Sequence, residues 1–128
     1  IILLLLAFIP WLFGFDVLYA LQDEAFDRAE GLKSVPARFG SRRAMQLAAL
    51  SHVVTIACLV GTALTLRRGP VFLGGVALVA AILVVEHRLV RGKDGNADLS
   101  KIPKAFFDCN AWVSMGLFAA TLIDALVR

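Results

Sequence analysis

The chain alternates between long apolar stretches and shorter segments rich in charged residues. The apolar stretches cover residues 1–21, 44–66, 69–85 and 105–127. A helix of about 20 residues crosses the hydrocarbon core of a bilayer, because each residue adds 1.5 Å and the core is about 30 Å thick. The pattern therefore predicts an all-α fold, a polytopic bundle of four transmembrane helices.

Two polar segments connect these stretches on one side of the predicted bundle. In residues 22–43 we expect the first helix to extend through about Glu30, to break at Gly31 and to continue into a short ordered loop. Glycine favours such a break because it lacks a Cβ atom and readily leaves the helical conformation. Residues 86–104 are charged and contain further helix breakers, and we expect them to form a loop.

The composition supports a location in the membrane. Hydrophobic residues make up 59% of the chain, whereas soluble domains contain about 45–50%. The excess is concentrated in the four stretches, so we expect the lipid bilayer as a partner. Nothing resembles a nucleic-acid-binding module, and no nucleic-acid partner is expected. Because the chain starts at Ile1 without Met or a charged leader, we expect it to be part of a longer protein.

The positions of Lys and Arg predict the orientation in the membrane. Of these 13 residues, five follow the first stretch, two follow the second, five follow the third and one ends the chain. Cytoplasmic loops carry an excess of Lys and Arg. We therefore expect residues 22–43 and 86–104 on the cytoplasmic side, with a bacterial inner membrane as the host.

Asp16 is the only charged residue within the first apolar stretch. A charged carboxylate at the centre of a bilayer costs at least about 2.5–3.5 kcal/mol. We therefore expect Asp16 to face the interior of the bundle or a polar cavity, and we regard it as a candidate functional residue.

Asp23 and Asp27 lie one helical turn apart in the following polar segment. Their Cβ atoms would be about 5–6 Å apart, and two like charges at this spacing destabilise a helix. A cation between them would remove the repulsion. Oxygen ligands suit Mg²⁺, which binds one or two carboxylates and completes its shell with water and substrate phosphates. Both are therefore candidate metal ligands, and a solvated acidic face at a helix end is the alternative.

Lys33 and Arg38 follow the acidic pair and can contact phosphate oxygens. Together with a metal ion they can neutralise a pyrophosphate and help it to leave. The position at the mouth of a membrane helix predicts a lipidic group on that pyrophosphate. If the group is allylic, its departure leaves a carbocation, which aromatic rings stabilise by about 0.5–2 kcal/mol each. Among the aromatic residues nearby, we favour Tyr19 for this role.

One long motif resembles the second aspartate-rich motif of the UbiA-type intramembrane prenyltransferases. It runs Asp16-x-x-Tyr19-Ala20-x-x-Asp23-x-x-x-Asp27-x-x-x-Gly31-x-Lys33-Ser34-x-x-x-x-x-Gly40. Its form is most similar to that of the 4-hydroxybenzoate polyprenyltransferases and their relatives in menaquinone synthesis. The opening of the last stretch, Lys104-Ala-Phe-Phe-Asp-Cys-Asn110, also resembles the final helix of the family.

The resemblance implies a fold of nine transmembrane helices around a central cavity, with these four as the sixth to ninth. It implies that Asp23 and Asp27 bind Mg²⁺. It also implies catalytic roles for Asp16, Tyr19 and Lys33, and it makes Asn110 a weaker candidate for substrate binding at the cavity. Arg38 is expected to bind the phosphate of the substrate. The first aspartate-rich motif of the family has no counterpart here, so the chain alone is expected to be inactive.

The implied reaction joins a polyprenyl diphosphate to a hydroxylated aromatic acid such as 4-hydroxybenzoate, in ubiquinone or menaquinone synthesis. The diphosphate ionises and the aromatic ring attacks the prenyl cation. The alternative is a non-enzymatic membrane subunit that binds or conducts a divalent cation. An inactive relative is a third possibility. His52, in the second stretch, could be a ligand or proton carrier, although we favour an ordinary packing role.

Overall fold

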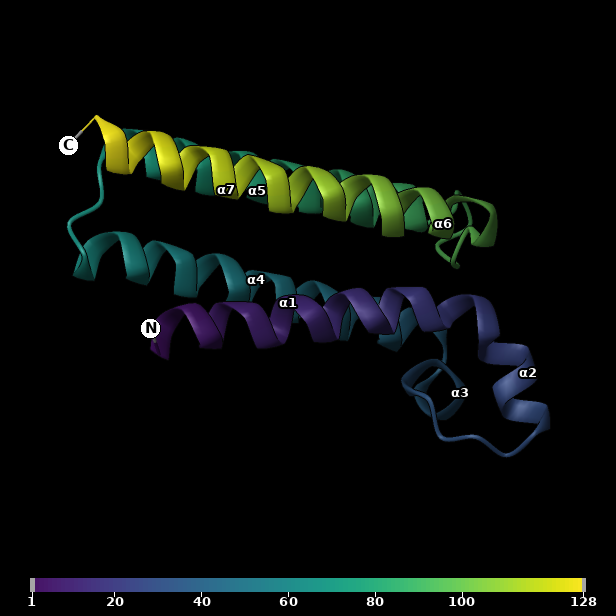
Figure 1. Ribbon diagram of the computed structural model, residues 1–128. Coiled ribbons are helices and arrows are strands. Elements are labelled where there is room, and N and C mark those ends of the chain that lie inside the picture. The colour runs from purple at the N-terminus through teal and green to yellow at the C-terminus, as the bar shows by residue number, and fades with distance from the viewer. Residues whose placement is uncertain (1, 128) are drawn as a thin grey trace.

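The computed structural model describes residues 2–127, which form an all-α bundle of four long helices (Figure 1). Each lies in a segment that is long and apolar enough to cross a membrane, so the predicted fold class is confirmed. The long helices are α1 (Ile2–Ala20), α4 (Ser41–Thr65), α5 (Pro70–Val90) and α7 (Asn110–Leu126). The short elements are η1 (Leu21–Asp23), α2 (Glu24–Ala29), α3 (Val35–Phe39), η2 (Leu99–Lys101), α6 (Ile102–Lys104) and the π-helix η3 (Ala105–Cys109).

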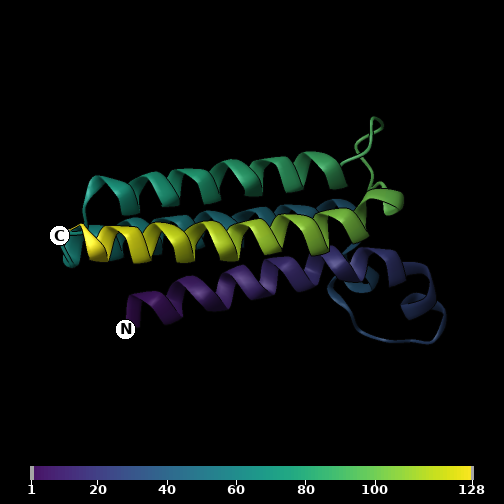
Figure 2. The same cartoon turned by 45° about the horizontal axis from the view of Figure 1, so that its top comes forward.

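The helices pack as two pairs, α1 with α4 and α5 with α7, and α4 also contacts α5 (Figure 1). Both ends of the described chain lie at one end of the bundle (Figures 1 and 2). The segment with α2 and α3, and the loop between α5 and α6, lie at the opposite end. The two loops that are richest in Lys and Arg therefore share one side of the bundle, as the alternating charge predicts.

Close helix contacts hold each pair together. Gly14 of α1 lies so near α4 that a Cβ atom added there would be 2.6 Å from Nε2 of His52. Gly75 of α5 allows an equally close approach of α7, because a Cβ atom there would overlap that of Ala120. Small residues allow such approaches, which maximise van der Waals contact where lipid provides no hydrophobic drive for helix association.

Helix α5 continues to Val90, whereas the sequence pattern predicted an end at Val85 and a loop from Glu86. The extra turn stays helical because it packs inward: Glu86 and Val90 are both about 1% exposed. The last membrane segment likewise begins earlier than predicted, at Leu99, through η2, α6 and η3. The loop between the two segments is therefore shorter than the expected residues 86–104.

Asp124 of α7 stabilises the start of α5 from a neighbouring helix. Its Oδ1 atom accepts a hydrogen bond from the backbone N–H of Phe72 at 3.3 Å, and its Oδ2 atom lies 3.5 Å from the Arg68 guanidinium. Phe72 lies in the first turn of α5, where backbone N–H groups have no partner within the helix. The buried carboxylate thus caps α5, and its negative charge interacts favourably with the positive N-terminal end of the helix dipole.

Replacing Asp124 with alanine is expected to lower the free energy of unfolding by about 2 kcal/mol, because a buried N–H and a partly buried guanidinium lose their acceptor. Asp124→Asn retains an oxygen for Phe72 and should cost about half as much. Thermal unfolding in detergent measures both, with Asp108→Ala on an exposed carboxylate as the control. Equal effects of Asp124→Ala and Asp108→Ala would contradict the capping role.

Candidate functional site

We use the name acidic segment for residues 21–39, which follow α1 and comprise η1, α2 and α3. Asp23 is the last residue of η1 and is exposed, and Asp27 lies on α2 and is half-buried. Neither carboxylate has a hydrogen bond or ion pair within residues 2–127. Helix α2 ends at Ala29, and the chain turns at Gly31, where the sequence predicted the break; Gly31 has φ = 70°, a conformation that favours glycine. Two unpaired carboxylates are therefore presented just beyond the end of a membrane helix.

A different carboxylate, Glu24, positions α2. It accepts a hydrogen bond from Arg28 at 2.8 Å, one turn along the helix, and another from the Ser41 hydroxyl at the start of α4. This contact links the acidic segment to the transmembrane bundle. Glu24 consequently has a structural role, while Asp23 and Asp27 stay available to a ligand.

The predicted phosphate-binding cations lie in the same segment and are exposed. Lys33 lies between Gly31 and α3, and Arg38 lies on α3 with its guanidinium 5.3 Å from the ring centroid of Phe39. The Ser34 hydroxyl caps α3 by accepting a hydrogen bond from the Ala37 N–H at 3.4 Å. Because α2 and α3 are in contact, the two cations and the two carboxylates belong to one ordered unit.

Asp16 is expected from the sequence to face the bundle interior or a polar cavity, and in the structure it lies outside the interior of the four described helices. It is exposed on the surface of α1. The side of α1 that packs inward carries Gly14, Val17 and Leu18, and a residue two positions from Gly14 lies about 200° around the helix. Asp16 therefore points away from α4, on a side that these four helices leave uncovered.

Tyr19 belongs to an aromatic cluster between α1 and the start of the last membrane segment. Its ring centroid is 4.1 Å from that of Phe106 in η3, and Phe15 stacks on Phe106 at 4.0 Å. Trp11 continues the cluster, 6.3 Å from Phe15. Tyr19 is still 38% exposed. The sequence pattern does not predict the contact of Tyr19 with Phe106, since no local pattern reports a contact between residues 87 positions apart.

The acidic segment offers two carboxylates as candidate ligands for Mg²⁺. Within residues 2–127, no three His, Cys, Asp or Glu side chains are grouped to hold a metal ion. Two carboxylates, at Asp23 and Asp27, nevertheless meet the requirement of Mg²⁺ for one or two protein oxygens, with water and phosphate completing its shell. By donor type and number these residues would suit a Mg²⁺ ion that binds together with a diphosphate, whereas they do not form an all-protein cage.

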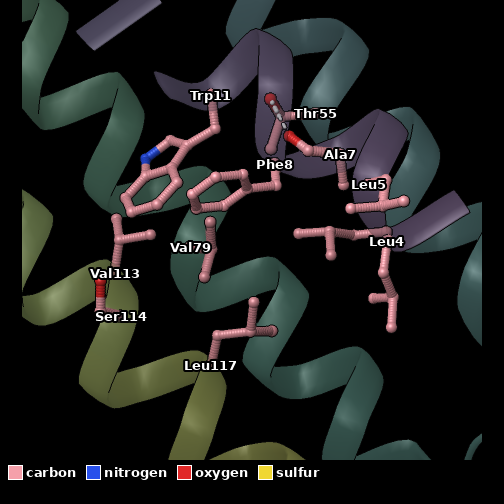
Figure 3. A pocket seen from close by; sticks show the side chains of 11 residues that line it. Leu4, Leu5, Ala7, Phe8, Trp11, Thr55, Val79, Val113, Ser114 and Leu117 are labelled. Atoms are coloured by element: carbon pink, nitrogen blue, oxygen red, sulfur yellow. Dashed lines mark hydrogen bonds between the residues drawn. The ribbon is translucent and has the colours of Figure 1, made fainter. Parts of the chain in front are cut away.

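An apolar cavity of about 400 Å³ lies between the four long helices (Figure 3). Its walls include Phe8 and Trp11 from α1, Val79 from α5, and Val113 and Leu117 from α7. Of the polar groups beside it, the Thr55 hydroxyl donates to the backbone oxygen of Ala7 at 3.1 Å (Figure 3), whereas the buried indole N–H of Trp11 has no hydrogen-bond partner within residues 2–127. The cavity therefore suits a hydrocarbon and offers little to an ion.

A buried polar cluster joins α4, α5 and α7. Nδ1 of His52 lies 2.9 Å from Nε2 of His87 and 3.8 Å from Oε2 of Glu86. Asn110, predicted to bind substrate, donates to Oε1 of Glu86 at 3.5 Å and to the backbone oxygen of Phe106 at 2.7 Å. The structure thus places Asn110 inside the bundle, linked to the aromatic cluster through Phe106 and separate from the acidic segment.

The sequence pattern predicts a loop from Glu86 onward, and for that reason it does not reveal this cluster. A signal was present, because the buried residues of α5 recur at helical spacing, and Glu86 continues the stripe. The stripe comprises Val76, Val79, Leu83, Glu86 and Val90.

Comparisons with known proteins identify the family of the chain. The model of the UbiA prenyltransferase family matches residues 1–120. The chain is 33% identical over 126 residues to the 4-hydroxybenzoate octaprenyltransferase of Dechloromonas aromatica (strain RCB), covering 97% of this chain and 40% of the relative. It is 34% identical over 122 residues to the protein of that name from Aromatoleum aromaticum, covering 95% and 40%. The chain thus spans about 40% of the length of these curated relatives, and no solved structure matches it.

Proposed function

Since the chain belongs to the UbiA prenyltransferase family, we propose that it is part of an enzyme that transfers a polyprenyl group from its diphosphate to 4-hydroxybenzoate. Two of the relatives described above carry the name 4-hydroxybenzoate octaprenyltransferase, which supports this acceptor and a place in ubiquinone synthesis. An aromatic acceptor of menaquinone synthesis is the alternative within the same chemistry. The observation that carries the proposal is the pair of unpaired carboxylates, Asp23 and Asp27, beyond the end of a membrane helix.

We assign the diphosphate to the acidic segment. Asp23 and Asp27 would hold Mg²⁺, which would neutralise the diphosphate and stabilise it as a leaving group. Lys33 and Arg38, which have no ion pair within residues 2–127, would contact its remaining oxygens. Charge-assisted hydrogen bonds of this kind are strong and directional, so these residues would fix the diphosphate over the mouth of α1.

The reaction then requires the allylic C–O bond to break, with its electron pair leaving on the diphosphate. The prenyl cation would form beside the exposed ring of Tyr19, whose neighbours Phe15 and Phe106 add two more aromatic rings. A ring carbon of the acceptor attacks the cation and then loses its proton, which restores aromaticity. Rings that face a developing cation lower its energy by cation–π attraction.

The apolar tail of the donor would extend from this point toward the membrane interior. The 400 Å³ cavity in Figure 3 is lined almost entirely by hydrocarbon and aromatic groups, so it could take up part of an isoprenoid chain. Asp16 faces away from the four helices, and we assign the surface opposite it to the part of the longer protein that lies outside this chain. That part would also complete the metal site, so this chain alone would be inactive.

The charged end of the bundle would face the cytoplasm, where soluble Mg²⁺ and the acceptor are available. The alternative function, a subunit that conducts a divalent cation, receives less support. An ion path needs polar groups across the bilayer, whereas α1 from Ile2 to Phe15 is apolar and the cavity beside it is lined by apolar groups.

A direct test measures transfer of a radiolabelled polyprenyl group to 4-hydroxybenzoate in liposomes that contain the complete protein. We expect product in the lipid phase only with Mg²⁺ and no product after addition of EDTA. A panel of hydroxylated aromatic acids identifies the preferred acceptor. Absence of transfer to any acid, together with Mg²⁺ flux across the same liposomes, would contradict the proposal and favour the ion-conducting alternative.

A further inference from the structure

A second hollow, of about 630 Å³, lies between α4 and α5 and shares no lining residue with the cavity in Figure 3. Its walls are mainly apolar and include Val53 and Ile56 of α4 with Leu83 and Val84 of α5. On α5 these walls extend from Ala80 to His87, about 10 Å along the helix axis. We call this hollow the α4/α5 groove.

One end of the α4/α5 groove is basic. Arg88 and Arg91 line it directly, and an adjoining hollow of about 200 Å³ shares Arg91 and adds Arg42 from the start of α4. All three side chains are exposed, and none has a hydrogen bond or ion pair within residues 2–127. The groove therefore ends in three guanidinium groups whose charge no carboxylate of the described chain neutralises.

The position of these arginines along the helices indicates what they meet. Arg88 lies in the last turn of α5 and Arg42 in the first turn of α4. The ends of membrane-spanning helices lie at the level of the lipid headgroups. The apolar walls then lie at the depth of the acyl chains, and the basic end lies at the depth of the phosphates.

We propose that the α4/α5 groove binds an anionic phospholipid. Its acyl chain would lie between α4 and α5, and its phosphate would contact Arg42, Arg88 and Arg91. Basic pockets between transmembrane helices recognise anionic headgroups in this way. A guanidinium group can bind two oxygens of one phosphate through two parallel hydrogen bonds. A zwitterionic lipid carries a positive group that three unpaired cations would repel.

This site shares no residue with the acidic pair and does not depend on the proposed reaction. Asp23 and Asp27 lie in η1 and α2, whereas the groove and its basic end lie on α4, α5 and the loop after α5. Two other occupants of the groove are distinguishable by experiment. A soluble phosphate could bind the arginines alone, and another segment of the longer protein could cover the apolar walls.

The test uses the complete protein in detergent and measures lipid binding by native mass spectrometry. We expect dioleoylphosphatidylglycerol to bind in preference to dioleoylphosphatidylcholine. The Arg88→Gln/Arg91→Gln double variant should bind the anionic lipid about 25-fold more weakly, since each guanidinium near the surface contributes about fivefold. The matched control, Arg43→Gln/Lys93→Gln, removes two exposed charges that do not line the groove and should change binding less than twofold.

Two further measurements distinguish lipid binding from binding of soluble phosphate and from coverage by another segment of the protein. Ala57→Phe fills the apolar wall without changing charge and should weaken lipid binding, while millimolar inorganic phosphate should not displace the lipid. Displacement by phosphate, equal binding of both lipids, or an equal loss in the control variant would overturn the proposal. Protection of Ala57→Cys from a lipid-soluble maleimide in lipid-free complete protein would also overturn it, because another segment would then cover the groove.

Discussion

Replacing Asp23 with asparagine in the complete enzyme is expected to lower kcat for prenyl transfer by about a hundredfold to a thousandfold. The substitution keeps the size of the side chain and removes the negative charge that would hold Mg²⁺. Loss of one group that stabilises developing charge has effects of this order. Asp27→Asn should lower kcat by a similar factor. If both carboxylates act on one ion, the double variant should lower kcat little more than either single variant does.

Asp94→Asn is the matched control for this experiment. Asp94 lies in the loop after α5, and its two carboxylate oxygens accept hydrogen bonds from the side-chain amide and the backbone N–H of Asn96. These hydrogen bonds, the side-chain one foremost, lower the pKa of Asp94, so it is ionised at neutral pH. Its replacement therefore removes one charge at the same end of the bundle. Prenyl transfer that falls equally in Asp94→Asn and Asp23→Asn would refute a specific role for Asp23.

Gly75→Ala is expected to lower the free energy of unfolding by about 3 kcal/mol. The added methyl group would overlap Ala120 of α7, and Ala120 has no flexible side chain that can move aside. The two helices must then separate, which forfeits packing along their whole contact. Insertions into a close-packed interior typically cost about 1–3 kcal/mol, and an overlap with a rigid methyl group lies at the upper end.

The adjacent residue supplies the control. A Cβ atom added at Gly74 would have nothing within 4 Å, so Gly74→Ala should be neutral or slightly stabilising because alanine favours the helix. The double variant Gly75→Ala/Ala120→Gly moves the methyl group to the other helix and should recover most of the loss. Thermal unfolding in detergent would measure all three. A Gly75→Ala variant as stable as Gly74→Ala would contradict the close packing of α5 on α7.

The sequence predicted the features that depend on local composition. Apolar stretches of membrane length predicted the four helices, and Gly31 predicted the turn that follows α2 because a positive φ favours glycine. The motif from Asp16 to Gly40 indicated the family that the comparisons support. These features follow from residues that are near one another in the chain.

Contacts between distant residues could not be predicted in the same way. His52 and His87 are 35 positions apart, and the pairing of Tyr19 with Phe106 depends on how α1 meets η3. The interior side of α1 was also ambiguous, because apolar residues surround Asp16 on all sides in the sequence. In the structure Gly14 packs against α4, which determines the interior side of α1 and leaves Asp16 exposed.

The central claim is that Asp23 and Asp27 bind the metal ion of a prenyl diphosphate. Its most direct test is electron paramagnetic resonance of Mn²⁺, which favours the same oxygen ligands as Mg²⁺, on the complete protein with a non-reactive prenyl diphosphate analogue. The account predicts tight Mn²⁺ binding that requires the analogue and is lost in both Asp23→Asn and Asp27→Asn, while Asp94→Asn binds normally. Analogue-dependent Mn²⁺ binding that is unchanged in the Asp23→Asn/Asp27→Asn double variant would contradict it.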